Sequence, residues 1–128
     1  MSILDLLLET DSKKLELKFS KQFEVKRLSE KIGEPFIITC APTTTEQLVH
    51  VSEISNSITE IKMNTVLECC KIDGKKIATK ELMEKFKALT PINLLEKLLL
   101  PGEIYTLYNK VQEISGYNDG GVEEIKNS

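Results

Sequence analysis

The residues that could carry chemistry in this 128-residue chain are one histidine and three cysteines, His50, Cys40, Cys69 and Cys70. His50 lies in the segment EQLVHVSEI, which contains no serine or cysteine nucleophile motif. An isolated histidine of this kind is more typical of a helix surface or edge than of a general base. The sequence also lacks the two common glycine-rich phosphate loops. The residue types and their spacing therefore favour a binding or assembly protein and not an enzyme.

The cysteines do not have the spacing of a metal site or of a disulfide framework. Zinc sites use pairs such as C-x₂-C, whereas Cys69 and Cys70 are adjacent and on a helix would point about 100° apart. An odd number of cysteines with an adjacent pair is also a poor basis for disulfides. We interpret all three as reduced thiols at small apolar positions of a cytoplasmic protein, and we expect no metal and no other cofactor.

Composition and charge restrict the partners. The chain has 17 Lys and Arg against 20 Asp and Glu, a net charge of −3, and no tryptophan. Nucleic-acid binding needs a basic surface, so nucleic acid is disfavoured as a partner. The apolar run at the N-terminus has no basic region before it and contains Asp5, which argues against a signal peptide. Because no stretch reaches the ~18 apolar residues of a membrane span, no membrane partner is expected.

The order of sequence patterns predicts an α+β fold that is mainly α, in which a short N-terminal β-hairpin precedes a bundle of four or five short helices. Residues 23–28 alternate apolar and polar, and residues 35–40 are rich in β-branched side chains. Gly33 lies in a turn-like stretch between these two segments. Together they indicate a hairpin over residues 23–40.

Residues 1–22 precede this hairpin as an arm or linker. Residues 2–8 suit a short helix with Ser2 as its N-cap. Residues 9–22 are polar and charged, and their weak alternation assigns them no definite structure.

Helical spacing dominates residues 43–115. The apolar positions recur three and four residues apart, as on the buried face of an amphipathic helix. The first helix is expected to start at a capping box of Thr43 and Glu46 and to break near Asn56 or Ser57, and a second helix is expected to reach Cys70. A turn at Asp73-Gly74 and a cap at Thr79 then start a third helix, whose inner face carries Leu82, Met83, Phe86 and Leu89. A further helix is expected to start at Thr90-Pro91.

The last helical segment lies in LLLPGEIYTLYNKVQEISGY, residues 98–117. Pro101 interrupts the preceding leucine run and can equally open a new helix. An apolar stripe follows, and Gly116 stands where a left-handed stop residue is expected. Residues 117–128 have little apolar content, so we expect a disordered tail behind a single domain over residues 23–116.

This segment resembles the C-terminal signature of the XkdN-like family of phage tail assembly chaperones. In that family a Pro-Gly-Glu-Ile segment precedes an amphipathic helix that ends in a small-Gly-aromatic sequence. The matching positions are Pro101, Gly102, Glu103, Ile104, Leu107, Ile114, Ser115 and Gly116. The resemblance covers roughly residues 20–117, and the linker between the two expected strands is longer than the family pattern.

The resemblance implies a phage or prophage protein of the host cytoplasm that is absent from the mature virion. Such a chaperone is expected to bind the tape-measure protein, a long helical chain, and to keep it soluble until the tail tube forms around it. Tail tube protein and self-association are further contacts that the resemblance suggests. We expect partner contacts at Leu98, Leu99, Ile104, Leu107 and Tyr108, and the alternative is that these side chains belong to the core.

Two other classes of function remain open from the sequence. A small structural or completion protein of a phage tail or other phage particle would stay in purified particles, whereas a chaperone would not. A transcriptional regulator or anti-host factor built on the helices would show salt-sensitive DNA binding, against which the acidic charge argues.

Overall fold

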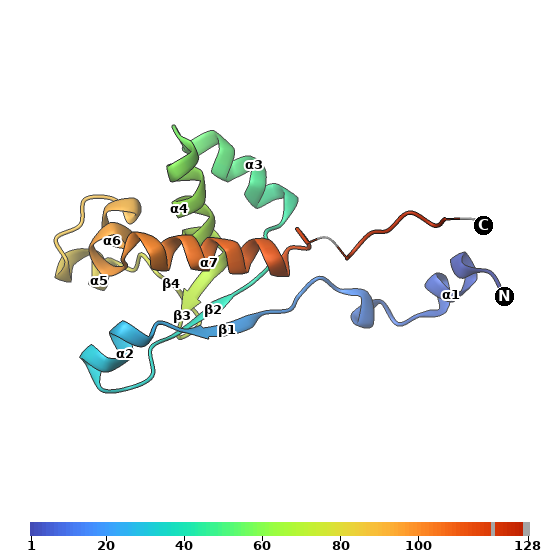
Figure 1. The fold of residues 1–128 in the computed structure, drawn as a ribbon, viewed down its shortest axis with the longest axis horizontal. Coiled ribbons are helices and arrows are strands. Elements are labelled where there is room, and N and C mark those ends of the chain that lie inside the picture. The colour runs from blue at the N-terminus through green and yellow to red at the C-terminus, as the bar shows by residue number, and fades with distance from the viewer. Residues whose placement is uncertain (119, 127–128) are drawn as a thin grey trace.

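A computed structural model describes residues 1–118 and 120–126 of the chain (Figure 1). Within this part the chain forms seven α-helices, one 3₁₀ turn and a four-stranded antiparallel sheet. This arrangement confirms the predicted fold class, α+β and mainly α. The helices of the described part are too short or too polar to cross a membrane.

The elements follow one another with short connections, and the strands lie in the sheet in the order of the sequence. The helices are α1 (Ile3–Glu9), α2 (Lys26–Ile32), α3 (Thr45–Ile54), α4 (Ile58–Cys69), α5 (Lys80–Lys85), α6 (Pro91–Leu98) and α7 (Pro101–Ile114), with the 3₁₀ turn at Ser12–Leu15. The strands are β1 (Lys21–Glu24), β2 (Ile37–Cys40), β3 (Cys70–Ile72) and β4 (Lys75–Lys76).

The expected hairpin over residues 23–40 needs a correction. Strands β1 and β2 do pair antiparallel, with Phe23 opposite Ile38. However, β1 ends at Glu24, and helix α2 stands where the sequence predicts the rest of a strand and a simple turn. The helix forms because Val25 and Leu28, three residues apart, are both buried in the core. Gly33, at φ 88°, ends this helix as a left-handed cap and does not turn a hairpin.

A second hairpin was not anticipated by the sequence analysis. The predicted turn at Asp73-Gly74 is confirmed, with φ values of 51° and 75°, and it joins β3 to β4. Two consecutive left-handed residues suit the twist of a tight hairpin. Helix α4 therefore ends at Cys69, and Cys70 belongs to β3, directly opposite Cys40 of β2.

Most of the predicted helix boundaries are confirmed. Side chains cap α1, α5 and α6 at the predicted positions, which are Ser2, Thr79 and Thr90. The predicted break near Asn56 or Ser57 is also confirmed, and Ser57 caps α4 there. The capping box of α3 lies one residue later than predicted, at Thr44 and Gln47. Thr43 is engaged elsewhere, because its N–H donates to Ser115 Oγ at 2.9 Å.

Helix α5 is shorter than the predicted apolar stripe. It ends at Lys85, and Lys87 adopts φ 52°, which turns the chain out of the helix. The side chain of Leu89 is consequently 92% exposed, so its predicted place on the inner face is wrong. Leu82, Met83 and Phe86 do pack against the core.

The core lies between α7, α4 and the inner face of the sheet, with α6 closing one end (Figure 1). The predicted stripe of α7 is confirmed, because its four aliphatic side chains are all buried. They are Ile104, Leu107, Val111 and Ile114. Gly116, at φ 92°, follows α7 as the predicted left-handed residue.

The described residues of the tail lie outside this core. Residues 117, 118 and 120–126 are exposed and form no helix or strand. The predicted disorder of residues 117–128 stays a prediction, and residues 119, 127 and 128 lie outside the part that the structure describes.

Truncation of the core should be costly at Leu95, whose side chain is fully buried. We expect Leu95→Ala to lower the free energy of unfolding by about 2–5 kcal/mol, because a cavity is added to the lost transfer energy. Urea unfolding measures this change. Leu89→Ala is the matched control and should leave the urea midpoint nearly unchanged, since Leu89 is almost fully exposed. Equal losses in the two variants would contradict this assignment of the core.

Candidate functional site

The histidine lies at the protein surface beside one carboxylate. His50 lies on the exposed surface of α3, as predicted, and its Nε2 is 3.3 Å from Glu68 Oε1. Across residues 1–118 and 120–126, no three His, Cys, Asp or Glu side chains gather in a way that could hold a metal ion.

The cysteines are free and buried, as small core residues would be. Cys40 and Cys70 lie on neighbouring strands with their Sγ atoms 3.0 Å apart. The contact with Cys40, followed by burial, raises the pKa of Cys70. Burial likewise raises the pKa of Cys69. These two thiols therefore stay protonated near neutral pH and are poor nucleophiles or metal ligands.

The Pro-Gly-Glu-Ile segment forms the joint between three helices. Pro101 opens α7, and the Leu100 N–H donates to Glu103 Oε1 at 2.7 Å. The same carboxylate accepts hydrogen bonds from Arg27 of α2, from Nη2 at 2.9 Å and from Nε at 3.1 Å. Arg27 Nη2 also donates to the Leu98 carbonyl at the end of α6, at 2.9 Å. Glu103 thus caps one helix while it binds the arginine that ties α2 to α6.

The ion pair perturbs the titration of both partners. The hydrogen bonds from Arg27 lower the pKa of Glu103, while partial burial opposes this effect, and the Leu100 N–H adds to the lowering. The hydrogen bond to Glu103 correspondingly raises the pKa of Arg27. Both groups are charged at neutral pH, and the bidentate geometry is the strong form of such a pair.

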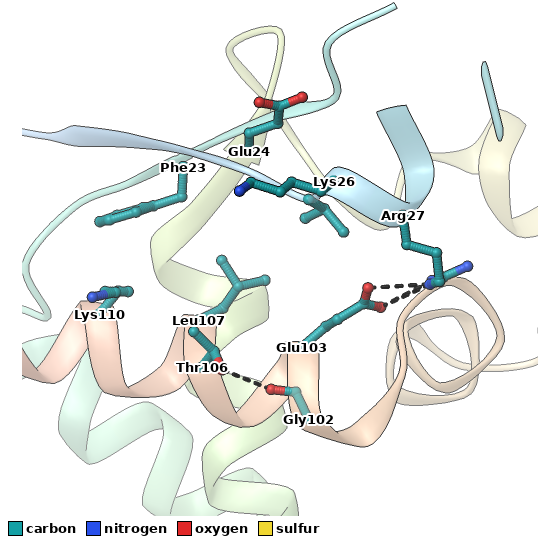
Figure 2. A pocket seen from close by; sticks show the side chains of 10 residues that line it. Phe23, Glu24, Lys26, Arg27, Gly102, Glu103, Thr106, Leu107 and Lys110 are labelled. Carbon is teal, nitrogen blue, oxygen red and sulfur yellow. Dashed lines mark hydrogen bonds and ion pairs between the residues drawn. The ribbon is translucent and has the colours of Figure 1, made fainter. Parts of the chain in front are cut away.

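Two grooves flank helix α7. The first, here called the α2–α7 groove, has a volume of about 390 Å³ and separates α7 from β1 and the start of α2 (Figure 2). Its lining residues are Phe23, Glu24, Val25, Lys26, Arg27, Gly102, Glu103, Thr106, Leu107 and Lys110. In Figure 2 the ring of Phe23 points toward α7, whereas the carboxylate of Glu24 points away from it.

The second groove lies between α4, the end of α6 and α7, and is here called the α4–α7 groove. It has a volume of about 400 Å³. Its lining residues are Thr59, Lys62, Met63, Glu96, Leu99, Pro101, Ile104 and Tyr105. At its rim the Nζ of Lys62 lies 5.1 Å from the ring centroid of Tyr105 and 5.8 Å from that of Tyr108. The groove thus combines an apolar floor with a cation and aromatic rings at the edge.

The five predicted partner contacts lie mainly in the core. Leu99, Ile104 and Leu107 are 3%, 7% and 4% exposed, and Leu98 and Tyr108 are half-buried against the core. Leu99 and Ile104 nevertheless line the α4–α7 groove, and Leu107 lines the α2–α7 groove. Their role as partner contacts stays a prediction.

Sequence reasoning passed over Tyr105, which is 52% exposed and lines the α4–α7 groove. A signal for it was present, because Tyr105 lies outside the apolar stripe of α7. A large aromatic side chain outside the buried stripe of a helix is a candidate for partner contact.

These features are those of a small binding protein that offers grooves between helices. The family comparison agrees with this class, since the model of the phage XkdN-like tail assembly chaperone proteins matches residues 4–127. The chain belongs to this family. The match includes most of the N-terminal arm and of the tail, beyond the segment that carries the sequence resemblance. No curated protein and no solved structure matches the chain.

The Arg27–Glu103 pair makes stability depend on pH in a defined direction. Because the pKa of Glu103 is lowered in the folded state, its contribution is present above the unfolded pKa of about 4.3 and disappears as the pH falls through the folded value. We therefore expect Glu103→Gln to lower the urea midpoint at pH 7, and we expect its difference from the wild type to shrink as the pH falls below about 4.

Glu113→Gln is the control for that comparison, since Glu113 is an exposed acid of the same helix whose contact with Lys110 is 3.7 Å. It should leave the midpoint nearly unchanged at both pH values. If the urea midpoints of the wild type and of Glu103→Gln differed as much at pH 3 as at pH 7, this result would argue against a stabilising ion pair.

Proposed function

We propose that this chain binds an amphipathic helical segment of the tape-measure protein in the α4–α7 groove and keeps that protein soluble while the tail tube assembles. The observation that carries the proposal is an open groove with an apolar floor, of about 400 Å³, beside the segment that carries the family signature. Helices commonly dock in such grooves by inserting apolar side chains three or four residues apart.

The lining of the groove suits a partner of this kind. Met63 and Ile104 provide an apolar floor, and methionine adapts its shape to different side chains. Tyr105 and Lys62 at the rim supply an aromatic face and a positive charge. A long tape-measure helix would expose apolar stripes that aggregate in water, and such a groove would cover one section of a stripe.

Binding of this kind is readily reversed. The groove offers few polar groups, and the cost of ordering both partners offsets part of the gain from apolar burial, which leaves a moderate affinity. We infer that tail tube protein displaces the chaperone as the tube grows, and that the chaperone acts by binding alone in the host cytoplasm. In this scheme no covalent bond is made or broken on the chain, whether it comes from a phage or a prophage.

A substitution at the rim should separate binding from folding. We expect Tyr105→Asp to reduce the capture of a co-expressed tape-measure fragment by roughly tenfold or more, because exposed aromatic side chains often dominate such interfaces. Tyr108→Asp, at the second ring near Lys62, should weaken capture in the same direction. The measurement is a pull-down of helical fragments of the tape-measure protein encoded by the same phage genome.

Leu89→Asp serves as the control for the pull-down, since Leu89 is exposed and lies outside both grooves. It should capture the fragments as the wild type does. Undiminished capture by folded Tyr105→Asp and Tyr108→Asp proteins would remove the α4–α7 groove from the proposal.

The composition of the mature particle offers an independent test. A chaperone that is displaced during tail assembly should be abundant in infected cells and absent from purified virions. Mass spectrometry of both samples measures this difference. Presence of the chain in virions at a fixed copy number would instead favour the alternative, a small structural or completion protein of the particle.

A further inference from the structure

Strands β2 and β3 bring two cysteines of the core face to face. Cys40 and Cys70 are 30 residues apart in the sequence, yet they are direct partners in the antiparallel register, and their Sγ atoms are 3.0 Å apart. Both are free thiols, and both side chains are fully buried. The sequence draws attention to the adjacent pair Cys69-Cys70, whereas the fold pairs one cysteine from each strand.

The backbone places Cys40 and Cys70 where a disulfide can span the two strands. The Ala41 N–H donates to the Cys69 carbonyl at 2.9 Å, so the ladder hydrogen bonds flank the Cys40–Cys70 pair and do not join it. In such a pair the Cα atoms are about 4.5 Å apart and the side chains are close. Disulfides join residues whose Cα atoms are about 4.4–6.8 Å apart. The two sulfur atoms therefore need to approach by only about 1 Å to reach bonding distance.

The third cysteine has different neighbours. The Sγ of Cys69 lies 3.3 Å from Thr43 Oγ1 and 3.8 Å from Gln47 Oε1. Cys69 also lines a surface groove of about 430 Å³ beside the N-terminal arm and the start of α3. Its hydrogen-bonding neighbours are thus a hydroxyl and an amide, whereas the sulfur atoms of Cys40 and Cys70 contact each other.

We propose that Cys40 and Cys70 form a site of reversible oxidation, at which a hydroperoxide such as hydrogen peroxide joins β2 to β3 through a disulfide. A second thiol within reach diverts the first oxidation product to a disulfide, before it proceeds to irreversible forms. In a reducing compartment the pair is at rest as two thiols. The proposal is independent of the proposed function, since neither cysteine lines the α4–α7 groove.

Cys40 is the sulfur that reacts first. The hydrogen bond from Cys70 lowers the pKa of Cys40, and burial opposes this effect. The thiolate, which is the reactive form of cysteine, attacks one oxygen of the peroxide. An S–O bond forms, the O–O bond breaks, and the released hydroxide takes up the proton that Cys40 lost and leaves as water. Cys40 then carries a sulfenic acid.

Cys70 completes the reaction. Its pKa is raised chiefly by the contact with Cys40, and this cause weakens once the Cys40 sulfur carries a hydroxyl in place of a negative charge. The Cys70 sulfur attacks the Cys40 sulfur, an S–S bond forms, and the S–O bond breaks. The hydroxide leaves with the Cys70 proton as a second water. Two thiols are thereby oxidised to one disulfide, and one peroxide is reduced to two waters.

The short hairpin of β3 and β4 gives an oxidant access to the buried pair. Strand β4 has two residues, lies at the edge of the sheet, and pairs with β3 through Lys71–Lys76 and Ile72–Lys75. Segments with so few backbone hydrogen bonds open locally at a lower free energy than the whole fold. Such an opening admits a molecule as small as hydrogen peroxide without global unfolding.

The cross-link should stabilise the folded chain. It closes a loop over residues 41–69, which contains α3 and α4, and a closed loop removes conformational freedom from the unfolded chain. The folded chain needs only a small movement, because the sulfur atoms are already in contact. We expect oxidation to raise the urea midpoint and a thiol reductant to restore the original value.

The first experiment uses the wild-type chain without any substitution. The reduced protein is treated with hydrogen peroxide, freed of excess oxidant and then unfolded for thiol titration. The titre should fall from three thiols to one per chain, and the mass should fall by two hydrogen atoms. Trypsin cleaves after Lys31, Lys62 and Lys71, so the link should join two tryptic peptides. They are residues 32–62 and 63–71.

Substitutions then assign the link to one pair. Cys69→Ser removes the second cysteine from the peptide 63–71 and is the matched control, which should still lose both remaining thiols. Cys40→Ala and Cys70→Ala should keep both remaining thiols under the same treatment. Circular dichroism verifies that each variant is folded, and the peptide map of the wild type does not depend on the folding of any variant.

Four outcomes would overturn the inference. They are a folded wild-type chain that keeps three thiols in peroxide, a link that involves Cys69, oxygen atoms added to Cys40 or Cys70 in place of a disulfide, and an oxidised chain whose urea midpoint is no higher than that of the reduced chain. The tape-measure pull-down is performed with the reduced protein and depends on Tyr105, so its failure and the failure of this inference are distinguishable.

Discussion

The structure depends on the way α7 is held against the rest of the body. Its apolar stripe packs on α4 and on the inner face of the sheet, and Glu103 fixes its first turn by binding both the Leu100 N–H and Arg27. Since the hydrogen bonds of Arg27 reach both Glu103 and the end of α6, a single side chain of α2 links that helix to α6 and to α7. The Pro-Gly-Glu-Ile segment is therefore a structural joint in this chain.

The position of α7 also determines the surfaces that are open to partners. Its buried stripe faces the core, so the residues on either side of the stripe line separate grooves. Pro101 and Tyr105 face α4, whereas Gly102 and Thr106 face β1 and α2. With a rotation of about 100° per residue, these two pairs lie on different sides of the helix. One helix thus borders two grooves that have different neighbours.

Much of the fold could be predicted from local sequence patterns. Caps such as Thr79 and Thr90, the stripe of α7 and the stop at Gly116 follow from interactions within a few residues. The predictions are wrong where tertiary contacts determine the local structure. Helix α2 replaces part of a predicted hairpin because Val25 and Leu28 are buried together, and the cap of α3 moves because Thr43 binds Ser115.

The candidate site was harder to predict for the same reason. A stripe of leucines and isoleucines looks alike whether it meets the core or a partner, and only the packing of α4 and α6 places Leu99 and Ile104 at the floor of a groove. Tyr105 becomes visible as a rim residue only when the neighbouring helices are known. The exposed leucines of α1 could be assigned to a helix from the sequence, but not to a surface that lies outside the body.

Hydrogen–deuterium exchange on the full chain tests the central claim most directly, because it locates bound surface without any substitution. With a helical tape-measure fragment present, the account predicts slower exchange in residues 59–63 and 101–108, which surround the α4–α7 groove. It predicts little change in α3, which does not line that groove. A complex that forms while these two segments exchange as fast as in the free chain would contradict the account.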